Sequence, residues 1–185
     1  MKSLSPDDGK PKNYFFWLGR DSLTGLHFDL TQGVLCQLIG TKTFYLASQQ
    51  ATRKLTPLPG SVSKSGFLPS RPDFVAFPQA REVEFWTGTL QPGELIVIPR
   101  LWWHSVVGHG VSLSLTHDFG RTLSNRELIS LVLGGGLRQT ARFTRDFIYH
   151  GLLRRPFVRR LTDDPPFGHL VYEMVAFSIR RRILG

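Results

Sequence analysis

The 185-residue chain has almost no cysteine and no long apolar segment. Its single Cys36 excludes an internal disulfide, a cysteine zinc knuckle and a cysteine-ligated iron–sulfur cluster. No apolar run approaches the ~20 residues that a membrane-spanning helix requires, and residues 1–13 lack the apolar stretch of a secretory signal. From these absences we expect a cytoplasmic protein without a membrane span.

Lysine is missing from the last third of the chain. Residues 120–185 contain 12 Arg and no Lys against 5 acidic residues, a net charge of +7, whereas residues 1–119 carry only +2 of the total +9. Arg154, Arg155, Arg159 and Arg160 form one cluster, and residues 180–182 form another. This asymmetry indicates either an acidic partner, such as nucleic acid, a membrane surface or an acidic protein, or a merely solvated helix face.

Eight short segments before residue 120 have the alternating or apolar pattern of β-strands. They are residues 13–19, 23–30, 33–40, 41–48, 81–90, 94–99, 102–107 and 111–119. Segments 33–40 and 41–48 are predicted to form a hairpin, and residues 108–110 (Gly-His-Gly) a turn. Residues 49–80 are a long proline-containing stretch of the kind that forms lids or binding loops.

The pattern changes to helical periodicity after Gly120. Residues 124–133, 136–153 and 167–183 are predicted helices, the first with a capping box formed by Ser124 and Glu127. We therefore expect a mainly β fold, a double-stranded β-helix of the jelly-roll or cupin type with C-terminal α-helices. The predicted organisation is a flexible N-terminus (1–12), a barrel (13–119) and a basic helical region (120–185).

Three residues have the spacing of a metal site. His27 and Asp29 lie two apart in an alternating strand, so their side chains share one face. His104, which is 75 residues beyond Asp29, is a third ligand if its strand lies beside theirs. Two imidazoles and one carboxylate leave open positions suited to non-haem iron(II) and oxygen chemistry.

Taken alone this pattern is weak, because His-X-Asp is common and His104 could be a core histidine. Lys42, 13 residues beyond Asp29, strengthens it. A lysine pointing inward among Leu38, Ile39 and Phe44 needs an anion, since an unpaired buried charge is costly. The distal carboxylate of 2-oxoglutarate would be such an anion.

The strings LTGLHFD, QLIGTKTFYL, LQPGELIVIPRLWWHSV and VSLSLTHDF, in this order, resemble the successive motifs of JmjC and cupin-like hydroxylases. That family includes the asparaginyl hydroxylase that acts on the hypoxia-inducible factor and the lysyl hydroxylases. The resemblance extends from about residue 14 to residue 119. It implies a double-stranded β-helix with the metal at the open mouth of the barrel.

The resemblance also implies roles for individual residues. It makes His27, Asp29 and His104 the iron(II) ligands, pairs Lys42 with the distal carboxylate of 2-oxoglutarate, and places Thr24 and, as a weaker match, Thr116 near the cosubstrate. Trp17 and Phe15 are candidate pocket walls, although core packing is their commoner role. Gly33 stands where some relatives carry Asn near the cosubstrate, so that contact is missing or comes from elsewhere. Relatives often dimerise through helices such as those after Phe119, which implies a possible homodimer.

The activity implied is hydroxylation, or demethylation, of a substrate C–H bond by iron(II), 2-oxoglutarate and O2, with succinate and CO2 as co-products. Two alternatives remain: a cupin-type binding module, or a metal cupin that does not use 2-oxoglutarate. In either, the Arg-rich helices would bind an acidic partner or nucleic acid. The substrate itself, a protein side chain, a nucleic acid or a small metabolite, has no signature in the sequence.

Overall fold

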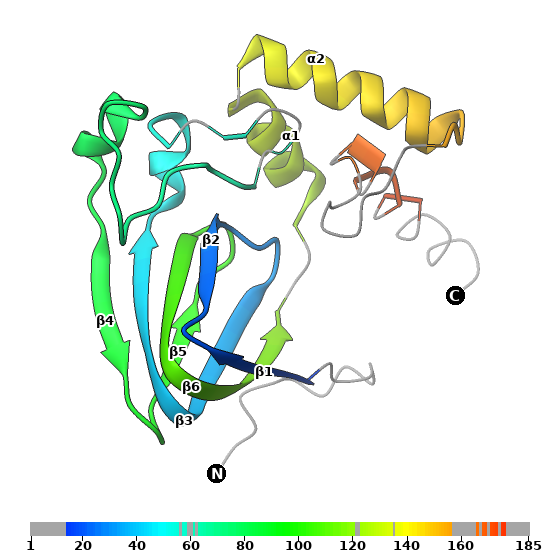
Figure 1. Ribbon diagram of the computed structural model, residues 1–185. Helices are drawn as coiled ribbons and strands as arrows, with labels where there is room; N and C mark the ends of the chain where they lie inside the picture. Colours follow the sequence, from blue (N-terminus) through cyan, green and yellow to red (C-terminus); the bar gives the residue numbers. More distant parts are fainter. Residues whose placement is uncertain are drawn as a thin grey trace. The chain divides into compact units, whose positions relative to one another are not determined.

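Two long antiparallel strands, β3 (Gln32–Ala47) and β6 (Trp103–Phe119), organise the β-region of the computed structural model (Figure 1). The structure describes residues 14–55, 57, 58, 61, 63–120, 123–134, 136–156, 166, 168, 169, 171–173, 175 and 176. These residues belong to two units. One comprises residues 1–56 and 63–123, and the other residues 57–62 and 124–185.

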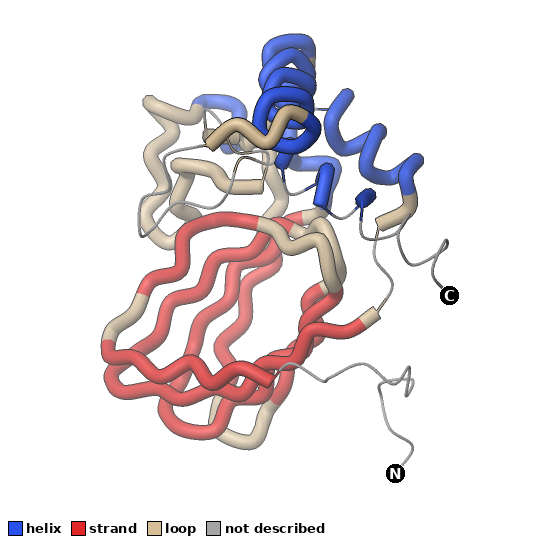
Figure 2. The backbone as a smooth tube through the Cα atoms, turned by 90° about the vertical axis from the view of Figure 1, so that its right-hand side faces the viewer, coloured by secondary structure: helices blue, strands red, loops and turns tan. Residues whose placement is uncertain are grey.

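Each long strand pairs with one short strand along its first half and with another along its second half. The first half of β3 pairs with β5 (Leu95–Ile98) and its second half with β4 (Trp86–Leu90). The first half of β6 pairs with β2 (Leu23–His27) and its second half with β1 (Tyr14–Arg20). The six strands form one hydrogen-bonded sheet, which runs in the order β1-β6-β3-β5 at one end of the long strands and β2-β6-β3-β4 at the other. Figure 2 shows the strands curving around a common interior. This arrangement confirms the expected jelly-roll architecture.

The predicted hairpin at residues 33–48 and the predicted turn at residues 108–110 are wrong. Both segments bend without reversing, because β3 and β6 remain paired with each other on either side of the bend. Gly40 has φ +69°, and a Cβ there would overlap the carbonyl oxygen of Val111. Gly110 has φ +59°. Glycine is required at the bend in β3 because other residues rarely adopt this backbone conformation and because the neighbouring strand leaves no space.

The boundaries of other β-segments also differ from prediction. The strand expected at 81–90 begins at Trp86, after the 3₁₀ helix η2 (Pro78–Glu82), and the strand expected at 23–30 ends at His27. The loop that leads to η2 begins with another 3₁₀ helix, η1 (Gln49–Arg53), and has an aromatic core of its own. There Phe67, which is 2% exposed, contacts the rings of Phe74, Phe77 and Phe85.

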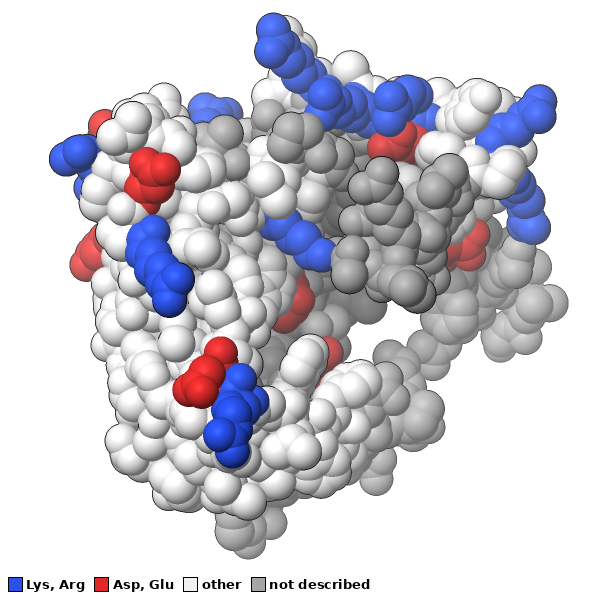
Figure 3. Space-filling view, in the orientation of Figure 1, with Lys and Arg blue, Asp and Glu red and all other residues white. Residues whose placement is uncertain are grey.

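The helical unit begins with α1 (Asn125–Gly134), and its capping box is formed as predicted. The Ser124 N–H donates to Glu127 Oε2 at 2.8 Å, and the Glu127 N–H donates to Ser124 Oγ at 3.3 Å. The single helix predicted at 136–153 is instead α2 (Leu137–Asp146) followed by the π-helical turn η3 (Phe147–Leu152). Arginine side chains gather along α2 (Figure 3).

Helical residues recur between 168 and 176, where Val171 is buried. Leu170, Met174 and Phe177, which we expected to pack beside it, lie outside the described residues, as do the clusters at 159–160 and 180–182 and the expected flexible N-terminus at 1–12. Within the described part of the chain, no helix is both long enough and apolar enough to cross a membrane.

Candidate metal centre and adjoining pocket

His27, Asp29 and His104 converge at one point of the barrel. His27 is the last residue of β2 and lies directly opposite His104 on β6, and their ring centroids are 4.2 Å apart. Asp29 follows β2. Its backbone carbonyl oxygen accepts a hydrogen bond from the Leu101 N–H at 2.8 Å, which fixes the backbone at this position. One donor atom from each of the three residues lies within 4.8 Å of the others. The strand pairing therefore brings together candidate metal ligands that are 75 residues apart in sequence.

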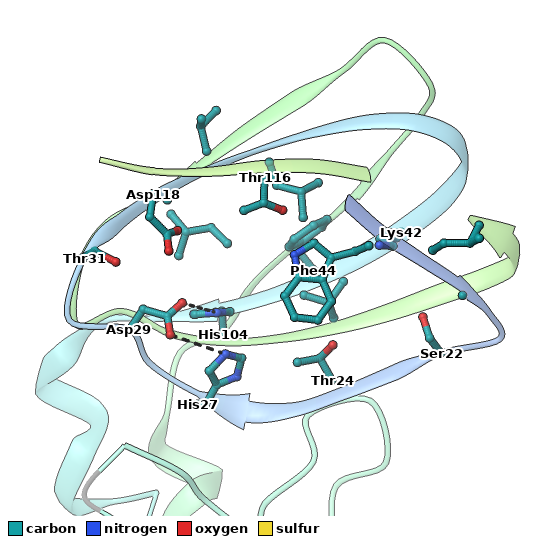
Figure 4. Close-up of a pocket in the computed structure, with 18 residues that line it drawn as sticks. Ser22, Thr24, His27, Asp29, Thr31, Lys42, Phe44, His104, Thr116 and Asp118 are labelled. Carbon is teal, nitrogen blue, oxygen red and sulfur yellow. Dashed lines mark ion pairs between the residues drawn. The ribbon is translucent and has the colours of Figure 1, made fainter. Parts of the chain in front are cut away.

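Both imidazoles are oriented by the backbone. Nδ1–H of His27 donates to the Gly25 carbonyl at 2.9 Å, and Nδ1–H of His104 donates to the Trp102 carbonyl at 3.0 Å. Because a carbonyl only accepts, these bonds place the proton on Nδ1 and leave Nε2 with a free lone pair. The two Nε2 atoms lie 3.9 and 3.5 Å from the Asp29 carboxylate oxygens (Figure 4). Such outer hydrogen bonds are typical of metal-binding histidines.

The electrostatics also favour neutral, metal-ready imidazole at His104. Burial, followed by the nearby His27, lowers the pKa of His104 to about 4, against opposing effects of the Trp102 hydrogen bond and Asp29. His104 is therefore unprotonated at neutral pH, the state that binds a metal. Two neutral imidazoles and one carboxylate on one side of a site are the donor set of non-haem iron(II) oxygenases.

The three residues line one end of a pocket of about 290 Å³, and Lys42 lies at the other end (Figure 4). Lys42 is 6% exposed, and no carboxylate among the described residues pairs with it. Burial lowers the pKa of its ammonium group. Its expected neighbour Phe44 is buried beside it in the pocket, but Leu38 and Ile39 are 39% and 54% exposed, contrary to expectation.

Thr24 and Thr116, the other residues assigned to the cosubstrate, line the same pocket. The hydroxyl of Thr116 is buried and has no hydrogen-bond partner among the described residues. A buried hydroxyl without a partner costs free energy, so this group is available for a ligand. Trp17 also lines the pocket, whereas Phe15 is not among the lining residues.

Sequence reasoning missed several pocket residues, among them the polar residues Ser22 and Asp118. Ser22 lies at the Lys42 end of the pocket (Figure 4), where a Cβ on Gly108 would be 2.5 Å from its hydroxyl oxygen and 3.7 Å from Lys42 Cε. Asp118 lies at the metal end, directly opposite Gly33 in the sheet. Ser22 lies outside the motifs named above, whereas Asp118 lies in the last of them, at residues 111–119, where no role was predicted for it. Their positions in the pocket follow from pairing between distant strands.

The absence of a side chain at Gly33 makes room for Asp118. A Cβ on Gly33 would lie 3.3 Å from Asp118 Oδ1. Burial, and next the negative charge of Asp29, raise the pKa of Asp118, while His117 opposes this effect. Some relatives carry Asn at the position of Gly33. In this chain the polar group at that place is the carboxyl of Asp118, which is supplied by the neighbouring strand β6.

Comparison with protein families agrees with the fold. The model of the cupin-like domain matches residues 3–122, which is more than half of the chain. The chain therefore belongs to the cupin-like domain family, and its relatives include JmjC-domain proteins.

Individual relatives can be named. The chain is 29% identical to Jumonji C domain-containing protein 5 of Drosophila melanogaster and 32% identical to lysine-specific demethylase JMJ30 of Arabidopsis thaliana, each over 103 residues. These alignments cover 54% of this chain and 26% and 24% of the relatives. It is 30% identical over 120 residues to tRNA wybutosine-synthesizing protein 5 of Danio rerio, covering 60% of this chain and 36% of that protein. The chain thus spans about a quarter to a third of the length of these relatives.

Proposed function

We propose that this chain is an iron(II)- and 2-oxoglutarate-dependent oxygenase that hydroxylates or demethylates its substrate. One observation carries the proposal. At opposite ends of the same pocket lie a His-Asp-His donor set and the buried Lys42, whose ammonium group has no carboxylate partner in the part of the chain that the structure describes. A molecule with a metal-chelating end and a distal carboxylate satisfies both ends at once, and 2-oxoglutarate has this structure.

The residues present fit these groups. Nε2 of His27, Nε2 of His104 and a carboxylate oxygen of Asp29 would hold iron(II) and leave three positions for the cosubstrate and oxygen. When bound, iron(II), 2-oxoglutarate and O2 supply oxidation of a C–H bond, with succinate and CO2 as co-products. Lys42 would pair with the distal carboxylate, and the hydroxyls of Thr24 and Thr116 would donate hydrogen bonds to the cosubstrate.

The apolar walls of the pocket would exclude water. Phe44, Ile98 and Val106 line it together with the polar residues. In such surroundings the attraction between the Lys42 ammonium and a carboxylate is stronger than in water, because the effective dielectric constant is lower. The pocket can therefore orient a dicarboxylate while its metal end stays open.

The names of the relatives indicate two substrate classes, since they include lysine-specific demethylases and tRNA wybutosine-synthesizing proteins. A substrate on a protein side chain and a substrate in RNA are both compatible with the same reaction.

The proposal is tested by substrate-independent turnover. Purified protein is supplied with iron(II), 2-oxoglutarate and O2, and succinate is measured by mass spectrometry. We expect succinate from the unmodified chain and a decrease of at least tenfold in His104→Ala. Binding of Mn(II), a redox-inactive stand-in, is measured on the same samples and should be lost together with succinate formation.

His109→Ala is the matched control. His109 is exposed, its Nε2 forms a hydrogen bond with Thr43 Oγ1 at 2.8 Å, and it does not line the pocket. The His109→Ala variant should therefore retain both succinate formation and Mn(II) binding. Metal binding without any effect of 2-oxoglutarate would instead identify a cupin that does not use this cosubstrate. Absence of metal binding by the unmodified chain would identify a binding module.

A further inference from the structure

Helix α2 carries a one-sided row of arginines. Arg138, Arg142 and Arg145 are spaced four and three residues apart, which places them within an arc of about 60° and along about 10 Å of the helix axis. All three are exposed, and Figure 3 shows the basic side chains following the helix. Residues 124–185 contain 11 Arg and no Lys against 5 acidic residues. The row therefore belongs to a positively charged region of the chain.

The opposite side of α2 is used for packing. Phe143 and Phe147 have ring centroids 5.9 Å apart, and the Phe147 ring meets Tyr172 edge-on at 5.5 Å. Gly168 approaches so closely that a Cβ would lie 2.5 Å from the Phe143 carbonyl oxygen. These contacts fix the rotation of α2 within its own unit, so the arginine row points to solvent.

The charges of the row are largely uncompensated. Neither Arg138 nor Arg142 pairs with a carboxylate among the described residues. Arg145 donates from Nε and Nη2 to Oδ1 of Asp146 at 2.8 and 2.7 Å, yet its side chain remains 68% exposed. Since Asp146 is buried, this pair holds the Arg145 guanidinium in place and leaves its remaining N–H groups free for a ligand.

We infer that the arginine row of α2 binds the phosphodiester backbone of a nucleic acid. Guanidinium groups bind phosphate oxygens in a bidentate manner, which accounts for Arg without Lys. Tyr149, which is 50% exposed in the adjoining turn, offers a ring on which an unpaired base can stack. Residues 154 and 155 extend the positive charge beyond this turn.

An anionic membrane surface fits α2 less well. A helix that lies in a membrane interface needs a free apolar face to insert between the lipids. In α2 that face is occupied by Phe143 and Phe147 packing within the unit. This inference does not depend on the proposed oxygenase activity, because it concerns only the helical unit.

The test measures binding of the full chain to a fluorescein-labelled 20-nucleotide single-stranded RNA by fluorescence anisotropy, at several salt concentrations. The test variant combines Arg138→Gln, Arg142→Gln and Arg145→Gln. Each lost phosphate contact lowers the slope of log K against log salt by about 0.7. Three contacts therefore account for a change of about 2 in slope and for roughly hundredfold weaker binding at 0.1 M salt.

The matched control combines Arg20→Gln, Arg71→Gln and Arg81→Gln, which removes the same charge from the other unit. We expect the control to keep the slope of the unmodified chain, and both triple variants to keep its melting temperature and succinate formation. A third variant with lysine at positions 138, 142 and 145 retains charge but not bidentate geometry, and should recover only part of the affinity.

Further arms define what is bound. Single-stranded DNA of the same sequence binding equally well would show that the phosphate backbone is the ligand, and preference for RNA would show that the 2′-hydroxyl is also recognised. Binding of the same variants to phosphatidylserine-containing vesicles is measured as well. The inference is overturned if the unmodified chain binds neither RNA nor DNA, or if both triple variants lose affinity for RNA equally. It is also overturned if the α2 triple variant loses binding to the vesicles but not to the nucleic acids.

Discussion

Lys42 allows a prediction with two opposite effects from one substitution. Lys42→Met removes the ammonium group but keeps an unbranched side chain of similar length. Lys42 as a whole is 6% exposed, and its ammonium group has no carboxylate partner among the described residues. Replacing it with an apolar group removes the cost of an uncompensated buried charge. We therefore expect the free energy of unfolding to increase.

The effect on cosubstrate binding has the opposite sign. If Lys42 pairs with the distal carboxylate, Lys42→Met leaves that carboxylate buried without a counter-charge. Breaking a buried pair on one side costs ~3–5 kcal/mol, and each 1.4 kcal/mol is a factor of about ten. The dissociation constant of 2-oxoglutarate should therefore rise by two to four orders of magnitude, while the affinity for Mn(II) stays the same.

The assay is isothermal titration calorimetry of 2-oxoglutarate into the Mn(II)-loaded protein, together with urea denaturation of the metal-free protein. Lys54→Met is the control, because the Lys54 side chain is 43% exposed and pairs with Glu82 at 3.0 Å outside the pocket. Unchanged affinity for 2-oxoglutarate in Lys42→Met would refute the assignment of this end of the pocket. If the ligand-free Lys42→Met variant is less stable than the unmodified chain, the inference that the buried charge of Lys42 is uncompensated is refuted.

Two further predictions concern acid sensitivity and the bend in β3. Because burial lowers the pKa of His104 to about 4 from 6.5, the unfolded chain binds more protons than the folded one between these values. The free energy of unfolding of the metal-free protein should fall by about 3 kcal/mol as pH decreases through this range, and His104→Gln should flatten the dependence measured by urea denaturation. Gly40→Ala should destabilise the fold by ~1–3 kcal/mol, since φ is +69° and the Cβ overlaps Val111. Gly88→Ala, whose Cβ meets no atom within 4 Å, should change stability little, and equal effects of the two alanines would contradict this account.

Local patterns in the sequence were sufficient for features that depend on near neighbours. The capping box of Ser124 and Glu127 forms because both residues lie in the first turn of α1, whatever packs around it. Alternation over residues 23–29 brought His27 and Asp29 together as a candidate ligand pair, and the ordered motifs led to the cupin-like family. The same local signals failed at Gly40 and at Gly108–Gly110. A glycine that bends a continuous strand and a glycine that reverses a chain look alike in sequence.

Only the tertiary structure decided the features that depend on strand register. The pairing of β2 with β6 places His104 opposite His27, and the pairing of β3 with β6 places Asp118 over the space left by Gly33. The isolation of Lys42 from any carboxylate of the described residues likewise depends on what surrounds it in three dimensions. Each of these contacts joins residues separated by tens of positions. Their geometry is set by backbone hydrogen bonds between distant strands and by the close-packed core inside the barrel. A short local run of amino acids does not encode either of these.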